Sequence, residues 1–188
     1  MQSIRITTKY LRSRQNPAVF YLHITIILLV LGQLLLSNFI KFNEAGEISK
    51  NAIYFYGTWA HIITGLFLAL ISAVFITFVL KAHEIKNFFP YLHGDYAQVV
   101  TDINKLKQLK LPEPNPGGLA SIVQGLGLGA LILVLFSGSA WFVFWRAGYQ
   151  GANVFKEMHG MLTGLVITYI IGHGGMGVFH ILSILRNE

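Results

Sequence analysis

The chain has 188 residues, of which 54% are hydrophobic and only 12% are charged, and its net charge is +6. Soluble domains carry about 25% charged residues, so this composition indicates a membrane protein with little chain left for a separate soluble domain. The sequence contains no cysteine, which excludes disulfides, thiolate metal sites and covalently attached haem.

Four apolar segments are predicted as membrane-spanning helices, at residues 18–40, 53–80, 119–144 and 158–185. Each exceeds the roughly 20 residues needed to cross about 30 Å of hydrocarbon. We therefore predict an all-α membrane protein, a four-helix bundle in which residues 1–188 form one domain. The first segment follows a basic tail, but it is too long for a signal peptide, so we expect it to be retained.

Basic residues are concentrated in the N-terminal tail and in the long loop 81–118. By the positive-inside rule, we expect both termini and this loop to be cytoplasmic, so nucleic acid is not needed to explain the charge. Aromatic residues near the other two loops fit the opposite membrane surface. The basic residues are Arg5, Lys9, Arg12, Arg14, Lys81, Lys86, Lys105, Lys107 and Lys110, and the aromatic ones are Tyr54, Tyr56, Trp59, Trp141, Trp145 and Tyr149.

Within the long loop, Val99, Ile103, Leu106 and Leu109 recur at helical spacing with lysines between them. This pattern predicts a short amphipathic helix on the cytoplasmic membrane surface. A solvated connector with one apolar stripe is the alternative. The third apolar segment then carries glycines at positions that permit close approach of another helix or of a planar ligand: Gly125, Gly127, Gly129 and Gly138.

Histidines lie within three of the four apolar segments: His23 in the first, His61 in the second, and His159, His173 and His180 in the fourth. An ionisable residue inside a membrane is costly and usually functional. On a helix, His159 and His173 would lie about 40° apart around the axis and about 21 Å apart along it, so they share a face at different depths.

The alternating direction of the helices decides which histidines share a depth. His61 and His159 each follow entry from the outside, which predicts an outer pair. His23 lies near the cytoplasmic edge and His173 in the inner half of its helix, which predicts an inner pair. His180 is an alternative partner for His23, because it follows His173 on nearly the same face.

Two imidazoles facing each other across a bundle are the arrangement that bis-histidine haem requires. Zinc normally takes three or four protein ligands at one point, and a proton relay would usually recruit acidic residues. The four apolar segments contain no aspartate or glutamate in their cores. We therefore predict two haem b groups, with iron held by His23, His61, His159 and His173.

The pattern resembles the bacterial cytochrome b561 family, which includes the dihaem cytochrome b subunits of nickel-iron hydrogenases and formate dehydrogenases. The matching marks are Phe20-Tyr21-Leu22-His23, Trp59-Ala60-His61 and the fourteen-residue spacing from His159 to His173. The resemblance implies a multi-pass protein of the bacterial inner membrane. It also implies one haem per leaflet and electron transfer between quinone and a redox partner protein.

The formate dehydrogenase branch of the family implies a quinone site before the third helix. Asn115-Pro116-Gly117-Gly118 resembles that segment, and Gln124 lies a little further on. Pro116 departs from the pattern, and a plain helix start with a Pro/Gly turn is the alternative. For the haem propionates, Arg146 and Lys156 are candidates at the outer level and Arg12 or Arg14 at the inner level. Each could instead contact lipid phosphate.

These features support three hypotheses about function. The first is an electron-transfer protein that joins a periplasmic-side dehydrogenase, hydrogenase or cytochrome to the quinone pool. The second is a stand-alone oxidoreductase of the same family that oxidises superoxide and reduces quinone. The third is a haem-free transporter or assembly factor, for which the sequence lacks short broken helices and intramembrane acids.

Overall fold

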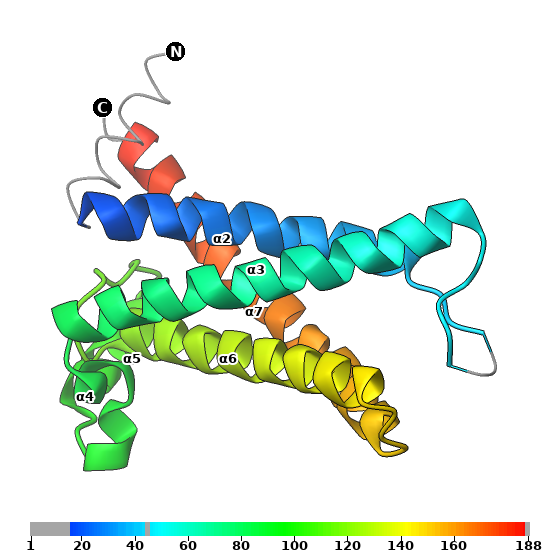
Figure 1. The fold of residues 1–188 in the computed structure, drawn as a ribbon. Helices are drawn as coiled ribbons and strands as arrows, with labels where there is room; N and C mark the ends of the chain where they lie inside the picture. The colour runs from blue at the N-terminus through cyan, green and yellow to red at the C-terminus, as the bar shows by residue number, and fades with distance from the viewer. Residues whose placement is uncertain (1–15, 44–45, 187–188) are drawn as a thin grey trace. The chain divides into compact units, whose positions relative to one another are not determined.

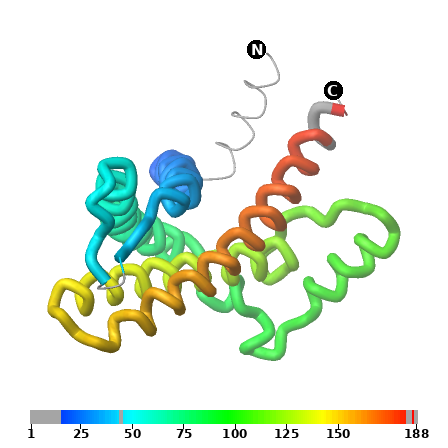
Figure 2. Tube along the Cα trace, turned by 90° about the vertical axis from the view of Figure 1, so that its right-hand side faces the viewer, coloured from blue at the N-terminus to red at the C-terminus, as the bar shows by residue number. Residues whose placement is uncertain are grey.

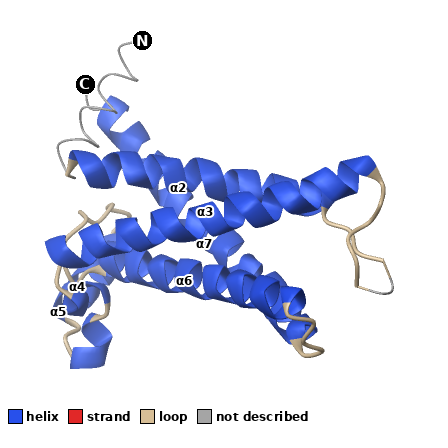
Figure 3. Cartoon of the chain, in the orientation of Figure 1, coloured by secondary structure: helices blue, strands red, loops and turns tan. Residues whose placement is uncertain are grey.

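The computed structural model describes residues 16–43 and 46–186, and this part of the chain is helical with connecting loops (Figures 1 and 3). Four of the described helices are long and apolar enough to cross a membrane. This confirms the all-α class and the four membrane-spanning helices. They are α2 (Pro17–Leu36), which the short helix η1 (Ser37–Phe39) extends, α3 (Ala52–Ala82), α6 (Leu119–Arg146) and α7 (Ala152–Arg186).

Local sequence explains where these helices begin. The Asn16 side chain accepts a hydrogen bond from the Ala18 amide at 2.9 Å, and Pro17 occupies the first position of α2, where its missing N–H costs nothing. Helix α7 begins at Ala152, ahead of the predicted span 158–185, because Asn153, Lys156 and Glu157 lower the hydropathy of its first turns. The basic tail, with Arg5, Lys9, Arg12 and Arg14, lies outside the described residues.

The described chain divides into two compact units, and the helices α3, α6 and α7 each contribute to both. Unit 1 comprises residues 79–134 and 160–186, and unit 2 comprises residues 16–43, 46–78 and 135–159. Each unit is described by itself.

In unit 2, polar contacts join α2 to α3. The Gln33 side chain donates a hydrogen bond to the Thr64 hydroxyl and lies opposite Gly65, where a side chain would come into contact with it. Further along, a Cβ on Gly57 would collide with Phe39. Small and hydroxyl-bearing residues therefore let the two helices approach closely, as is common between membrane helices.

The loop between α2 and α3 is held against the end of α6 by aromatic side chains. The ring centre of Phe42 lies 5.5 Å from that of Trp141 and 6.0 Å from that of Trp145. The Trp145 indole N–H also donates to the Gly46 carbonyl at 3.0 Å. A single bridge between Phe42 and Ile48 closes this loop. The predicted interfacial tryptophans thus anchor a loop of the protein itself.

In unit 1, the chain between α3 and α6 forms α4 (Ile85–Phe88), η2 (Pro90–His93) and α5 (Ala97–Lys107), which Figure 2 traces in green. The Asp102 carboxylate is 1% exposed. It accepts hydrogen bonds from the Gln98 side chain at 2.8 Å and from the Leu119 amide at 2.9 Å. It thereby caps the start of α6, where a helix favours negative charge.

Helix α5 coincides with the predicted amphipathic helix, but it ends before Leu109. Leu109 adopts a left-handed backbone conformation with φ of 57° and is 97% exposed. Exposed apolar side chains also include Val100, Ile103 and Leu106. Contact of this surface with lipid stays a prediction.

Candidate haem-binding site

The structure brings His61 of α3 and His159 of α7 together inside unit 2. Their ring centres lie 6.2 Å apart and their ring planes are inclined at 84°. Both lie on helices that cross the membrane, at positions where the sequence predicts a shared depth. The predicted outer pair is therefore close in space.

The spacing of this pair is compatible with two histidines that would hold one haem iron between them. A metal–nitrogen bond to histidine is about 2 Å long, and the ring centre lies about 1 Å behind the bonded nitrogen, so opposed imidazoles have centres about 6 Å apart. The observed 6.2 Å matches that value. Perpendicular ring planes are compatible with it, because both planes can contain the same iron–nitrogen axis. His61 and His159 would be the two protein residues that hold the haem, which would supply one-electron chemistry there.

Helix α6 supports the His159 ring through two consecutive residues. The fully buried Ser137 hydroxyl lies 3.4 Å from His159 Nδ1. A Cβ on Gly138 would come within 2.9 Å of His159 Cε1 and Nδ1, so only glycine leaves room for the ring. Metal-bound histidines usually have such a partner on the second ring nitrogen. If His159 holds a haem iron, this contact at Nδ1 would leave Nε2 as the ligating atom.

The His61 ring is also in a state suited to metal binding. Among the described residues, its buried Nδ1 has no hydrogen-bond partner. Buried polar atoms are nearly always paired, and an imidazole lone pair that accepts no hydrogen bond is available to a metal. The donor set of unit 2 therefore fits haem iron at the outer pair.

The histidines predicted for the inner pair fall in different units. In unit 2, His23 of α2 stacks on Phe75 of α3, with ring centres 5.8 Å apart. In unit 1, His173 of α7 stacks on Tyr169, with ring centres 5.0 Å apart. His180 lies further along α7 and is partly exposed. The pairing of His23 with His173 or His180 stays a prediction.

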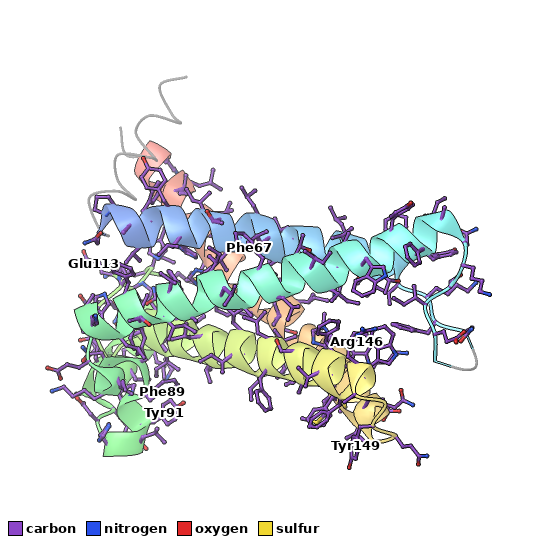
Figure 4. The ribbon with its side chains drawn as sticks, viewed as in Figure 1. Phe67, Phe89, Tyr91, Glu113, Arg146 and Tyr149 are labelled. Atoms are coloured by element: carbon purple, nitrogen blue, oxygen red, sulfur yellow. The ribbon has the colours of Figure 1, made fainter. Side chains whose placement is uncertain are left out.

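The two described candidates for propionate contacts have aromatic neighbours. The Lys156 ammonium lies 4.7 Å from the ring centre of Phe42, and the Arg146 guanidinium lies 6.0 Å from that of Trp145. Both side chains are exposed, and Figure 4 shows Arg146 near the end of α6. The contact of Lys156 helps to fix the loop between α2 and α3, which contains Phe42. A role toward propionates stays a prediction, and Arg12 lies outside the described residues.

The predicted quinone residues lie at the start of α6 in unit 1. The Asn115 carbonyl accepts from the Gly118 amide at 3.1 Å and from the Ser121 hydroxyl at 3.0 Å. Gly117 has φ of 72° and donates its amide to the Asn87 carbonyl at 3.2 Å. These contacts form a turn immediately before α6 begins. Gln124 is exposed on α6, and quinone binding stays a prediction.

Sequence reasoning missed Ser137, which is the hydrogen-bonding neighbour of His159. It noticed Gly138 only as a small residue, without identifying the imidazole as the group that fills the space. The available signal was a hydroxyl next to a glycine in the middle of an apolar helix. That signal is weak, because small residues also serve ordinary helix packing.

The family model of prokaryotic cytochrome b561 matches residues 14–186, which is nearly the whole chain. No curated protein and no solved structure matches the chain. The matched region contains all four membrane-spanning helices and the His61–His159 pair. The chain therefore belongs to the prokaryotic cytochrome b561 family, as a multi-pass b-type cytochrome of the bacterial inner membrane that functions in electron transfer.

Proposed function

We propose that this cytochrome carries two haems, one held by His61 and His159 and the other by His23 and His173, and that it transfers electrons across the membrane. The observation that carries the proposal is the 6.2 Å spacing of the His61 and His159 rings. Haem iron would supply one-electron chemistry, and a haem held by two protein histidines would suit electron transfer rather than oxygen activation.

Each residue around the outer pair has a distinct role in this proposal. His61 and His159 hold the iron from two different helices. Ser137 fixes the orientation of the His159 ring through Nδ1, and Gly138 keeps the space that the ring occupies. The apolar helices around the pair limit the access of water, which affects haem potential.

The proposed path joins a redox protein on the periplasmic side to quinone on the cytoplasmic side. Support comes from the basic loop 81–118, which predicts the cytoplasmic side, and from the turn at Asn115 and Gly117 with Gln124 nearby. The potentials of the two haems and of the partners set the direction of flow. Nickel-iron hydrogenase, formate dehydrogenase and cytochrome partners all fit this arrangement.

The ligand assignment is tested by counting haem in the purified full-length protein. We expect two haems per chain, with reduced b-type bands in the difference spectrum. His159→Ala should remove one haem and leave the other spectrum intact, whereas His93→Ala, outside the membrane-spanning helices, should leave both. Retention of two haems by His159→Ala would show that the outer ligands are wrong.

A stand-alone oxidoreductase is separated from a partner-dependent subunit by adding superoxide to the same preparation. Superoxide-dependent reduction of the haems without any partner would favour the stand-alone enzyme. Absence of that reduction, together with reduction by a partner dehydrogenase or hydrogenase, would favour the subunit.

A further inference from the structure

A tyrosine lies against the histidine predicted to ligate the inner haem. Tyr169 precedes His173 by four residues on α7, so the two side chains lie one turn apart on the same helix face. Their ring centres are 5.0 Å apart and their planes differ by 11°, which is a parallel stack. One face of the His173 imidazole is therefore covered by an aromatic ring of its own helix.

The Tyr169 ring also lies against α6, within the same unit. A Cβ on Gly127 would overlap the Tyr169 ring at Cε2, Cζ and Cδ2. Gly127 is buried, and no residue larger than glycine fits there while the tyrosine keeps its position. A Cβ on Gly129, two residues further along, would have no neighbouring atom within 4 Å. The glycine at 127 thus has a specific function in accommodating this ring.

The two contacts together restrict the orientation of His173. The Tyr169 ring stacks on the imidazole and also lies so close to Gly127 that it cannot move toward that part of α6 without a collision. An imidazole stacked on a fixed ring has a fixed plane. The orientation of a ligating imidazole and the polarity around it tune the potential of the bound metal.

We propose that Tyr169, seated on Gly127, is a positioning residue that holds the His173 imidazole in the orientation required for the inner haem. The inference rests on the proposed function, because it takes His173 as a ligand. The effect comes from the aromatic ring and not from the phenol hydroxyl. The ring also keeps water from the ligand, and low polarity favours the reduced haem, which carries one positive charge fewer than the oxidised form.

Four substitutions in the full-length haem-loaded protein test the proposal. Tyr169→Leu removes the ring, and Gly127→Ala displaces it without removing it. Tyr169→Phe keeps the ring, and Gly129→Ala adds a methyl group to the same helix in open space. The readouts are the potentials of both haems in a redox titration and the low-spin signals in electron paramagnetic resonance of the oxidised protein.

We expect Tyr169→Leu and Gly127→Ala to lower the inner-haem potential and to change its low-spin signal, while the outer haem stays at its wild-type potential. Tyr169→Phe and Gly129→Ala should match the wild type. An unchanged inner haem in Tyr169→Leu would overturn the proposal. The outer haem serves as an internal check that each variant has folded.

A further variant separates this inference from the ligand assignment. If His173→Ala loses one haem while Tyr169→Leu leaves the inner haem unchanged, the proposed function stands and the positioning role is wrong. If His173→Ala keeps both haems, the ligand assignment fails, and the positioning role fails with it.

Discussion

Replacing Gly138 by alanine tests the proposed haem site at His61 and His159 without changing either histidine. The new Cβ would lie 2.9 Å from two atoms of the His159 ring, whereas ordinary contact begins at 3.4 Å. The ring or helix α6 must therefore shift by about 0.5 Å, the difference between these two distances. Overpacking of this kind costs about 1–3 kcal/mol. If the whole cost falls on the ligated state, haem is held about 5- to 150-fold less tightly, since 1.4 kcal/mol is a factor of ten.

The assay is the haem content per chain, measured during dilution or extraction, together with spectra that report high-spin iron. We expect Gly138→Ala to lose the outer haem faster than the wild type and to keep the inner one. Gly129→Ala is the matched control on the same helix, because its Cβ meets nothing within 4 Å. Alanine favours helix over glycine by about 1 kcal/mol, so a weaker helix cannot explain the loss. Equal haem retention in both variants would refute the close packing of Gly138 on a ligating ring.

Three further predictions concern neighbouring features. Ser137→Ala should remove the partner of His159 Nδ1 and weaken haem binding at the proposed outer pair by roughly 10- to 100-fold, the usual effect of losing such a partner. Titration of the apoprotein with haem measures this affinity, and an unchanged affinity would contradict the prediction. Asp102→Ala leaves the Leu119 amide uncapped and should cost about 0.5–2 kcal/mol, seen as faster protease cleavage of residues 108–118 than in the exposed control Thr101→Ala. A cysteine placed at Leu109, in this cysteine-free chain, should react more slowly with a membrane-impermeant maleimide in lipid vesicles than one at Thr101. Leu109 is 97% exposed in the part of the chain that the structure describes, so slower labelling there would indicate cover by lipid, and equal rates would show that α5 does not lie on the membrane.

The sequence predicted the long helices because each contains an apolar run that is long enough to span a membrane. It also predicted the proximity of His61 and His159, since direction of entry fixes depth and depth limits the choice of partner. It placed the start of α7 too late, because Lys156 and Glu157 belong to a polar first part of the helix that hydropathy does not detect. It placed Leu109 on the amphipathic helix, whereas α5 ends at Lys107.

The contacts that support the ligands could not be predicted, because they depend on the rotation of each helix about its axis. Gly127 and Gly129 are two residues apart in the same apolar run, yet Tyr169 occupies the space beside Gly127, whereas Gly129 faces open space. Ser137 looks like any small polar residue until its distance to His159 is known. Spacing along a sequence gives the depth of a side chain, but the neighbour on the next helix follows from three-dimensional packing.

The location of His159 and His173 on one helix has a consequence for biosynthesis. In the proposed assignment each haem takes one ligand from α7, and α7 follows the other three long helices in the chain. The ribosome has therefore released α2, α3 and α6 before either iron site has its second histidine. Haem acquisition is thus a late event, and a cofactor that binds only the completed fold adds its binding free energy to the stability of that fold. On this assignment, chains truncated before α7 should enter the membrane without retaining haem.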